Sequence, residues 1–331
     1  MKVALLGAGR IGQLHATNLI SHPDVGAIVL CDADPERARQ LAAAVGGRAV
    51  RSAEEALEGA DAVVIAASTG AHEALVRLAI ERGVPTFCEK PLAFDLPETV
   101  ALVELIRQTK VPVQVGFQRR FDPAYREARR LVESGELGVV YLVRLIAHDH
   151  EPPPEAYIPT SGGLFRDSSI HDFDAIRWVT GQDVDEIYAT GSVRAFDVFA
   201  RHGDIDTGAA VLRLADGTLG VLGQTRHDPR GYDVRMEIVG SLDSITVGLG
   251  PRTPIRSLEP ETTAPSGLAW TNFLDRFAVA YREELGAFLR VARGEISSPC
   301  TADEALEAMR TSVAAARSLA ERRPVRVAEV R

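Results

Sequence analysis

A glycine-rich turn close to the start of the chain constrains the fold more strongly than any other feature of the sequence. An apolar run over residues 3–6 leads into the stretch GAGRIG at residues 7–12, which has the spacing Gly-x-Gly-x-x-Gly. Between a strand and a helix, the first glycine permits a tight turn, the second lets the backbone approach a pyrophosphate, and the third allows close helix–strand packing. A turn with a purely structural purpose is the alternative. We predict a dinucleotide-binding turn with contacts from Gly7, Gly9, Arg10, Ile11 and Gly12.

Short apolar runs alternate with helical segments over the first third of the chain. Parallel strands require crossover connections, so such alternation is typical of a parallel sheet with helices on both faces. The sequence therefore predicts an α/β protein in which residues 1–118 form a Rossmann domain with a doubly wound parallel sheet. Helical stretches include residues 35–45 and 72–82. The apolar runs cover residues 3–6, 27–31, 62–66, 85–88 and 111–116.

Residues 119–331 show a different rhythm, in which strand-like runs are joined by tight turns. The runs at residues 209–214 and 218–224 are linked through Asp216 and Gly217, a strong hairpin signal. We predict a substrate-binding and oligomerisation domain over residues 119–331, an α+β domain built on a mostly antiparallel open sheet. One face of this sheet would pack on helices and the other would be free for another subunit. A second hairpin is expected at residues 234–239 and 244–248, and helices at residues 123–134, 168–179, 273–293 and 302–322.

The charge balance and the cysteines limit the partners and the compartment. The net charge is −9, so a broad nucleic-acid-binding face, which needs clustered lysine and arginine, is not expected. We expect no export signal, and no apolar run reaches the roughly 18 residues of a membrane span. Cys31, Cys88 and Cys300 are widely spaced and odd in number, as expected of reduced thiols. We expect a cytoplasmic protein with no nucleic-acid and no membrane partner.

Asp32 is the residue expected to determine whether NAD or NADP is bound. It ends the second predicted strand, 20 residues after Gly12, where an acidic side chain accepts hydrogen bonds from the adenosine ribose hydroxyls. A carboxylate at this place repels a 2′-phosphate, so NAD is favoured over NADP. Capping of the helix at residues 35–45 is the alternative role for Asp32. Arg37, which we also count as a cofactor contact, is a nearby cation that could tolerate NADP.

Lys90 is a candidate catalytic group. It stands between Glu89 and Pro91, just after the strand predicted at residues 85–88, and open α/β sheets bind ligands at this carboxyl edge. Only three of the 37 lysine and arginine residues are lysines, which favours a role that arginine cannot fill. A lysine here can hydrogen-bond a reacting hydroxyl and stabilise the alkoxide that develops from it. A solvated loop lysine is the alternative.

A second candidate group lies in the stretch GGLFRDSSIHDFD at residues 162–174. Asp167 and His171 are four residues apart, so on one helix they would share a face. A carboxylate that holds an imidazole, with the imidazole accepting a hydroxyl proton, is a sound general-base arrangement. Alternatively, Asp167 is the N-cap of the helix and His171 only packs. From the residues alone, both interpretations remain open.

Four motifs follow one another along the chain. The glycine-rich turn is followed by Glu-Lys-Pro at residues 89–91, by GFQRRFDP at residues 116–123 and by SGGLFRDSSIHDFD at residues 161–174. This succession resembles the glucose-fructose oxidoreductase/inositol dehydrogenase (Gfo/Idh/MocA) family, and within it the myo-inositol 2-dehydrogenases. The likeness spans the whole chain. It implies NAD-dependent oxidation of a secondary hydroxyl of a cyclic polyol, with myo-inositol as the favoured substrate.

The resemblance also implies roles for individual residues. Lys90, Asp167 and His171 would be the catalytic and substrate-binding trio. His171 would take the substrate proton while the hydride passes to nicotinamide C4, Lys90 would bind the same hydroxyl, and Asp167 would orient substrate and His171. Further substrate contacts would come from Arg119, His150 and Tyr232. The residues expected along the cofactor are Ala66, Ala67, Ser68, Thr69, His72, Glu89, Lys90 and Gln118.

Other functions remain open. A pyranose sugar dehydrogenase using NAD or NADP would need the same groups, because recognition of ring hydroxyls depends on loop shape. A glycosidase that uses NAD transiently, or a cofactor sensor without catalysis, fits the motifs less well. The stretch HDHEP at residues 148–152 resembles metal ligands, but we expect no metal, because nicotinamide accepts the hydride while Lys90 and His171 manage the proton. The resemblance also implies a homotetramer or homodimer formed through the open sheet face.

Overall fold

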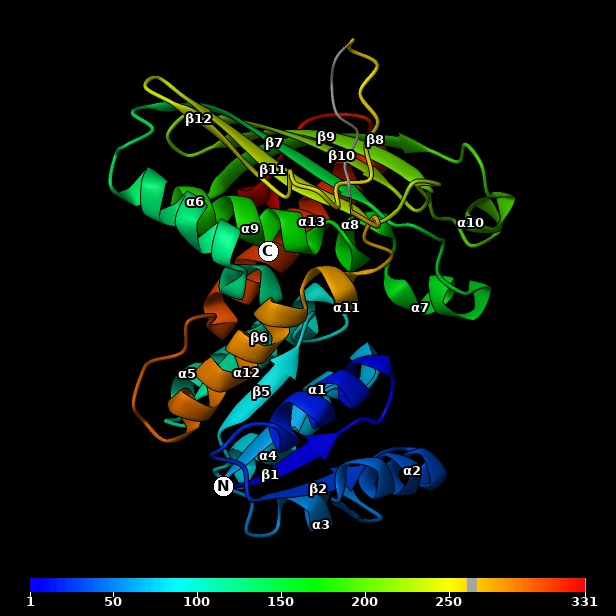
Figure 1. Cartoon of the computed structure of the whole chain (residues 1–331), viewed down its shortest axis with the longest axis vertical. Coiled ribbons are helices and arrows are strands. Elements are labelled where there is room, and N and C mark those ends of the chain that lie inside the picture. The colour runs from blue at the N-terminus through cyan, green and yellow to red at the C-terminus, as the bar shows by residue number, and fades with distance from the viewer. Residues whose placement is uncertain (261–266, 331) are drawn as a thin grey trace. The chain divides into compact units, whose positions relative to one another are not determined.

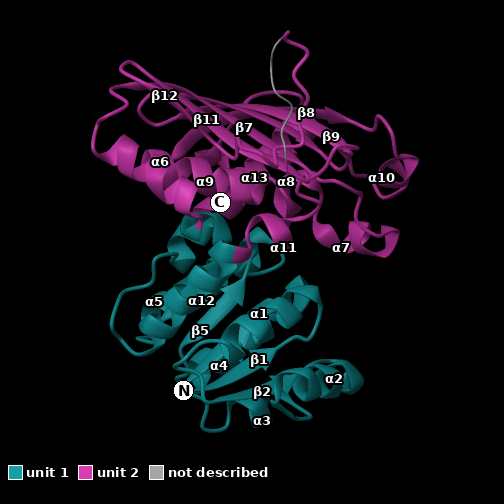
Figure 2. Ribbon diagram, viewed as in Figure 1, with its two compact units in different colours: residues 1–121, 279–306 teal, residues 122–278, 307–331 magenta. Residues whose placement is uncertain are grey.

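The computed structural model describes residues 1–260 and 267–330, and their packing divides the chain into two compact units. Unit 1 comprises Met1–Phe121 and Val279–Leu306, and unit 2 comprises Asp122–Ala278 and Glu307–Arg331 (Figure 2). The sequence predicts a cofactor-binding and a substrate-binding domain that meet between residues 118 and 119, and this boundary stays a proposal. The two units are defined instead by packing. Among the described residues, no helix is both long and apolar enough to cross a lipid bilayer.

Unit 1 is built on six parallel strands in the order β3-β2-β1-β4-β5-β6 (Figure 1). This is the order of a doubly wound dinucleotide-binding sheet, so the predicted parallel sheet is confirmed. Strand β3 has two residues and is too short to be predicted from apolar runs. The strands are β1 (Lys2–Leu6), β2 (Ala27–Cys31), β3 (Arg48–Ala49), β4 (Ala62–Ile65), β5 (Thr86–Glu89) and β6 (Val113–Gly116).

Several helices of unit 1 begin where the sequence supplies a cap. Asp34, Ser52 and Asp95 each accept a hydrogen bond from a backbone N–H in the first turn of the helix that follows. These caps satisfy amides that have no partner within the helix. The helices are α1 (Arg10–Ile20), α2 (Pro35–Val45), α3 (Ala53–Leu57), α4 (Thr69–Glu81), α5 (Leu96–Gln108), α12 (Ala278–Ala292) and the 3₁₀-helix η1 (Gln118–Phe121).

Both faces of the unit 1 sheet are buried. Val3 of β1 joins a core cluster with Leu19 of α1 and Phe288 of α12. Ala4 and Leu6 alternate with Val3 along the strand, so they face the other side of the sheet, and they are buried as well. Helix α12 comes from near the end of the chain, yet its apolar face completes the core beside β1. The glycine-rich turn that follows β1 therefore lies next to a well-packed core.

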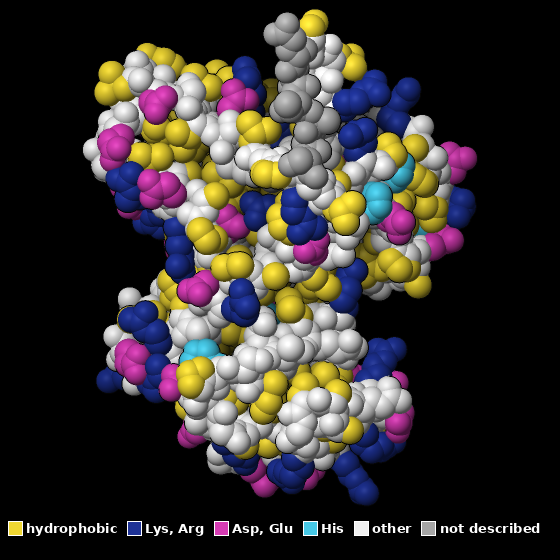
Figure 3. Space-filling model, in the orientation of Figure 1, with side chains coloured by type: hydrophobic (Ala, Val, Ile, Leu, Met, Phe, Trp, Pro, Cys, Tyr) yellow, Lys and Arg dark blue, Asp and Glu magenta, His cyan; other side chains and the backbone are white. Residues whose placement is uncertain are grey.

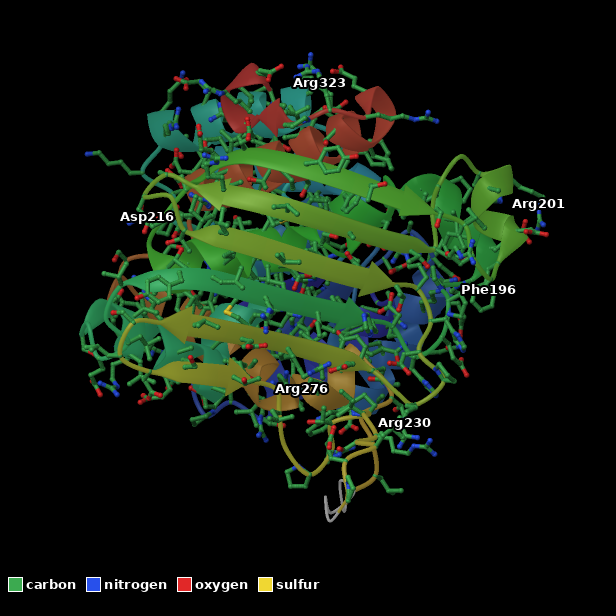
Figure 4. The ribbon with its side chains drawn as sticks, turned by 90° about the horizontal axis from the view of Figure 1, so that it is seen from above. Phe196, Arg201, Asp216, Arg230, Arg276 and Arg323 are labelled. Carbon is green, nitrogen blue, oxygen red and sulfur yellow. The ribbon has the colours of Figure 1, made fainter. Side chains whose placement is uncertain are left out.

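Unit 2 is built on seven strands in the order β12-β11-β7-β10-β9-β8-β13 (Figure 1). Neighbouring strands are antiparallel except β7 and β10, so the predicted mostly antiparallel sheet is confirmed. The predicted hairpin joins β9 to β10, and Gly217 in its turn has a φ of +93°. In Figure 4, Asp216 marks this turn, and Phe196 and Arg201 lie at the opposite end of the sheet. The strands are β7 (Val140–His148), β8 (Val184–Ser192), β9 (Thr207–Leu214), β10 (Leu219–Thr225), β11 (Asp233–Gly240), β12 (Ser244–Val247) and β13 (Val325–Arg326).

Helices cover one face of the unit 2 sheet, where α6 and α9 lie along it (Figure 1). Buried and exposed residues alternate along β9 and β10, as expected of strands with one covered face. The outward face exposes apolar side chains such as Tyr141, Tyr188 and Val211. The remaining helices are α6 (Pro123–Glu133), η2 (Glu155–Tyr157), α7 (Ile158–Ser161), α8 (Leu164–Asp167), α9 (Ile170–Thr180), α10 (Asp197–Arg201), α11 (Phe273–Arg276), α13 (Ala302–Glu321) and η3 (Val327–Glu329).

Candidate active site

The glycine-rich turn joins β1 to α1, as its spacing predicts. Gly7 has a φ of +108°, and a Cβ there would overlap the carbonyl group of Ala66. A Cβ at Gly12 would overlap the carbonyl oxygen of Gly7. Gly9 is different, because a Cβ there would meet nothing within 4 Å. Two glycines are thus required by packing, whereas the third leaves open space beside the start of α1.

The first turn of α1 can bind an anion. Gly9 is its N-cap and offers no side chain to the first backbone amides, and the turn contains no acidic residue. Such amides, together with the helix dipole, favour a phosphate group at a helix N-terminus. The open space at Gly9 and these amides fit the pyrophosphate of a dinucleotide. Arg10 and Ile11 are the first two residues of the helix.

Asp32 follows β2 and turns toward the glycine-rich turn. Its Oδ2 accepts a hydrogen bond from the backbone N–H of Ala8 at 2.6 Å, and its Oδ1 accepts one from Asp34 at 2.8 Å. The cap of α2 is Asp34, which accepts from the N–H of Glu36 at 2.9 Å. The capping role considered for Asp32 is therefore wrong. Arg37 lies in α2 with its guanidinium exposed, 3.5 Å from the Asp34 carboxylate.

The predicted cofactor residues follow the carboxyl ends of strands in one parallel sheet. Gly7, Asp32 and Lys90 come directly after β1, β2 and β5, and Ala67 and Gln118 lie two residues after β4 and β6. Carboxyl ends of parallel strands meet at one edge, and the strand order reverses between β1 and β4. Open α/β sheets bind ligands at such a switch point. The arrangement fits a nicotinamide dinucleotide lying along this edge.

His72 connects the turns that follow β4 and β5. It lies in the first half of α4 and is 1% exposed. Its Nδ1 lies 2.7 Å from the carbonyl oxygen of Pro91, and its Nε2 lies 3.1 Å from that of Ala67. Burial lowers the pKa of His72 below its usual value, although both carbonyl contacts act in the opposite direction. Ser68 is the N-cap of α4 and Thr69 its first residue, without a side-chain capping bond.

Glu89 is anchored from the opposite direction by a histidine of α1. Its Oε1 lies 2.7 Å from Nε2 of His15, and both side chains are buried. Phe87 and Tyr281 contact the His15 ring with their edges. Lys90, the next residue, therefore stands on a turn held by His15 through Glu89 and by His72 through Pro91. Sequence reasoning missed His15, whose position three residues after Gly12 in α1 was the available signal.

The short helix η1 places two further predicted contacts at the same edge. Gln118 and Arg119 follow β6 and are buried. The neighbouring Arg120 forms an ion pair with Glu304 at 2.6 Å and donates to the carbonyl oxygen of Pro299 at 3.1 Å. This pairing fixes η1 within unit 1. Buried polar side chains at a sheet edge are well suited to bind a polar ligand.

Asp167 and His171 do not belong to one helix. Asp167 ends α8 and His171 is the second residue of α9, so the predicted helix over residues 168–179 begins at Ile170 instead. The backbone N–H groups of Ser168 and Ser169 both donate to the carbonyl oxygen of Leu164, which interrupts the helical ladder. Ser169, not Asp167, is the N-cap of α9. The capping interpretation of Asp167 is therefore wrong.

The Asp167 carboxylate binds side chains from two other segments of unit 2, one 10 residues before it and one 59 residues after it. The hydroxyl of Tyr157 donates to Oδ1 at 2.7 Å, and Nη1 of Arg226 donates to Oδ2 at 2.8 Å. The same Nη1 lies 3.6 Å from Oδ2 of Asp149. Sequence reasoning missed both Tyr157 and Arg226. Period-two burial along β10, continued one residue beyond the strand, could have revealed a buried arginine at position 226.

The other predicted substrate contacts lie near the ends of β7 and β11. Nδ1 of His150 lies 3.0 Å from the carbonyl oxygen of Asp228, and Tyr232 is largely buried just before β11. Ligand atoms of His148, Asp228 and Asp233 lie within 4.8 Å of one another, a spacing that could hold a metal ion. However, Arg235 binds both carboxylate oxygens of Asp233, at 2.9 and 3.1 Å. The Asp233 charge therefore already has a partner.

The residues of the predicted catalytic trio are divided between the two units. Lys90 belongs to unit 1, with the glycine-rich turn and the other predicted cofactor residues. Asp167 and His171 belong to unit 2, with the predicted substrate contacts His150 and Tyr232. Unit 1 thus has the features of a dinucleotide-binding domain, and unit 2 carries the predicted acid–base pair.

The fold and the sheet edge together define a protein of the dinucleotide-binding class. A family model described as an oxidoreductase family with an NAD-binding Rossmann fold matches residues 1–117, and one described as the GFO/IDH/MocA C-terminal domain matches residues 125–246. The chain belongs to the Gfo/Idh/MocA oxidoreductase family, as the sequence predicted. It is an NAD-dependent dehydrogenase.

Relatives and solved structures agree along the whole chain. Myo-inositol dehydrogenase Hyg17 of Streptomyces leeuwenhoekii is 41% identical, over 96% of this chain and 97% of its own. Myo-inositol 2-dehydrogenase of Thermotoga maritima is 33% identical, over 100% and 99%. The crystal structure of a myo-inositol dehydrogenase from Corynebacterium glutamicum has a TM-score of 0.90 and 34% identity, covering 98% of both chains. That of scyllo-inositol dehydrogenase from Lactobacillus casei, with bound NAD(H) and scyllo-inositol, has a TM-score of 0.87 and 29% identity, covering 99% of both.

Proposed function

We propose that this protein oxidises a secondary hydroxyl of myo-inositol to the ketone, with NAD as the acceptor. The observation that carries the reaction type is the position of Lys90, which follows β5 at the same sheet edge as the glycine-rich turn. The substrate class rests on the full-length relatives, which are inositol dehydrogenases. On the face shown in Figure 3, acidic and basic side chains are interspersed over both units.

The cofactor would lie along the carboxyl edge of the unit 1 sheet. The open space at Gly9 and the first amides of α1 would receive its pyrophosphate, with Arg10, Ile11 and Gly12 beside it. Asp32 would accept hydrogen bonds from the adenosine ribose and repel a 2′-phosphate. When bound, NAD supplies the carbon that accepts the hydride. The remaining contacts proposed along it are Arg37, Ala67, Ser68, Thr69, His72, Glu89, Lys90 and Gln118.

The chain's own residues would move the proton. The ammonium of Lys90 would hydrogen-bond the reacting hydroxyl and stabilise negative charge on its oxygen as the hydride leaves the carbon. His171 would accept the hydroxyl proton, and Asp167 would orient His171 and the substrate. Each turnover thus removes one hydride and one proton from the alcohol and leaves a ketone. Arg119, His150 and Tyr232 are the further side chains proposed to bind ring hydroxyls.

The outward face of the unit 2 sheet and the cysteines bear on the assembly and the compartment of the protein. The outward face of the unit 2 sheet exposes Tyr141, Tyr188, Val211 and Val221. Large exposed apolar patches mark interaction sites, so we propose a homodimer or homotetramer formed through this face. The three cysteines are free thiols, which fits a reducing compartment such as the cytoplasm.

A substrate panel tests the proposed function. NADH formation is followed by absorbance with inositol stereoisomers and common pyranoses, and the series is repeated with NADP. We expect rapid turnover of myo-inositol with NAD and little with NADP. Activity on pyranoses alone would keep the reaction and discard the inositol assignment. No NADH with any member of the panel would contradict the proposal and direct attention to glycosides as substrates of a redox-neutral reaction.

A further inference from the structure

The carboxylate of Asp167 is held at both oxygens by side chains that the proposed reaction does not use. Tyr157 donates to Oδ1 at 2.7 Å and Arg226 donates to Oδ2 at 2.8 Å. One donor on each oxygen fixes the direction in which the carboxylate points.

Strand β10 places Arg226. Gly220, Leu222, Gln224 and Arg226 are buried at alternate positions, so Gln224 and Arg226 point to the same helix-covered face of the sheet. Gln224 accepts a hydrogen bond from the hydroxyl of Ser169. The backbone N–H of Arg226 donates to the carbonyl oxygen of Asp206 at 2.8 Å. The end of β10 thus contacts the break between α8 and α9 at two points, through Ser169 and through Asp167.

The Arg226 guanidinium faces two acids in a buried setting. Arg226 is 3% exposed, and its Nη1 lies 2.8 Å from Asp167 and 3.6 Å from Asp149. Burial by itself would lower the pKa of Arg226, yet the charges of Asp167 and Asp149 raise it above its usual value. Without the guanidinium, these two carboxylates would repel each other, which disfavours ionisation. Two further titratable groups act on the pair: Asp204 before β9 raises the pKa of Arg226, and Tyr157 in η2 donates to Asp167.

We propose that Arg226 is a positioning residue for the oxidation, which keeps Asp167 ionised and aimed so that Asp167 can orient His171 and the substrate hydroxyl. This inference rests on the proposed function, because it requires Asp167 and His171 to handle the substrate proton. Tyr157 supplies a second, uncharged contact to the same carboxylate. In this role, Arg226 would act on the reaction through its contact with Asp167.

The pH profile of kcat/KM separates this role from a merely structural one. Arg226→Gln keeps a hydrogen-bond donor but removes the positive charge. A neighbouring positive charge favours the ionised form of a carboxylate and lowers its pKa by about one to three units. We expect the acid limb of the profile to move to higher pH by about one to three units, so that kcat/KM at a fixed pH on that limb falls about tenfold for each unit of the shift. Arg226→Lys keeps the charge, so its acid limb should stay close to that of the wild-type protein.

Two further variants serve as controls. Gln224→Leu removes the contact with Ser169 but leaves the Asp167 carboxylate both of its partners. It should lower the melting temperature without moving the acid limb. Tyr157→Phe removes the uncharged donor from a side chain that is 43% exposed, so folding is not in question. Its acid limb should move upward by less than that of Arg226→Gln.

An unmoved acid limb in Arg226→Gln, or an equal shift in Gln224→Leu, would overturn the inference. If Arg226→Gln does not fold, the acid limb of the Tyr157→Phe profile is the deciding measurement. An acid limb that stays at its wild-type position in Tyr157→Phe would then overturn the inference. The Kd for NAD, measured by titration, should stay within a few-fold in every variant, and a parallel loss of NAD affinity would also contradict the role. A wild-type protein that oxidises no polyol or sugar would instead contradict the proposed function, so the two failures are distinguishable.

Discussion

The two units hold their candidate residues by different means. In unit 1, the dinucleotide site is shaped by backbone: two glycines fit because they have no side chain, and α1 offers its first amides. In unit 2, the candidate acid–base site is shaped by side chains, because Asp167 is bound by Tyr157, 10 residues before it, and by Arg226, 59 residues after it. A site shaped by the backbone depends on one contiguous motif. A site shaped by side-chain contacts depends on how the strands and helices of the whole unit pair and pack.

This difference predicts opposite sensitivities to substitution. Adding a single methyl group should damage the site in unit 1, where space is required. Removing a functional group should damage the site in unit 2, where contacts are required. Lys90 is an exception within unit 1, because its role depends on an ammonium held on a turn between two histidines.

The largest effect is expected for His171. The variant His171→Ala should lower kcat by about 10²–10⁴, because a positioned general base contributes a factor of that order. Steady-state rates of NADH formation across pH measure this, with His227→Ala, which removes an exposed histidine of the same unit, as the control. A near-normal rate at every pH would exclude His171 as the general base.

Lys90 should come next. The variant Lys90→Ala is expected to lower kcat by about 10²–10³, because one donor that stabilises a developing oxyanion is worth about that much. Its Kd for NAD should stay within a few-fold of the wild-type value. Lys110→Ala, which changes an exposed lysine of the same unit, is the matched control and should retain full activity. If Lys90→Ala loses NAD affinity as much as rate, Lys90 binds the cofactor rather than acting in the reaction.

A pair of glycine variants tests the backbone site directly. Gly12→Ala should destabilise the fold by about 1–3 kcal/mol, because its Cβ would overlap the Gly7 carbonyl oxygen and overpacking costs about that much. Gly9→Ala should leave the melting temperature unchanged and weaken NAD binding, since its Cβ meets only open space. Thermal melting with and without NAD measures both effects. Equal melting temperatures in the two variants would contradict this assignment.

The smallest effect concerns His72 and pH. Because the folded state lowers the pKa of His72, the unfolded chain binds the proton more readily, so stability rises with pH through this range. The stability that the neutral form of His72 contributes is lost as the pH falls below the unfolded-state pKa of about 6.5. The free energy of unfolding changes there by at most about 1.4 kcal/mol per pH unit. Denaturant unfolding of the wild-type protein and His72→Gln between about pH 5 and 7 measures it. Identical slopes in the two proteins would be the contrary result.

Much of the fold could be predicted because its signals are local. The strands at residues 27–31 and 85–88 and the hairpin at Asp216 are marked by apolar runs and turn residues, and the structure has strands at β2, β5, β9 and β10. The packing of α12 could not be predicted, because an amphipathic helix does not reveal which core it completes. Phe288 packs in the core of unit 1, more than 150 residues after the last strand of that sheet.

The candidate site shows the same division. Asp32 could be identified from its distance to Gly12, since one βα unit sets that spacing. The break between Asp167 and His171 could not, because the four-residue spacing is also that of a continuous helix. Arg226 escaped prediction for another reason. It lies beyond the end of β10, and its partner Asp167 is 59 residues away in sequence, so only the sheet register brings them together.

We propose that the protein transfers a hydride from a ring carbon of myo-inositol to NAD. The most direct test uses myo-inositol deuterated at all six ring carbons, with NAD, followed by mass spectrometry of the reduced cofactor. We expect one deuterium atom in each NADH and slower turnover than with unlabelled substrate. NADH without deuterium, or no NADH at all, would contradict the claim.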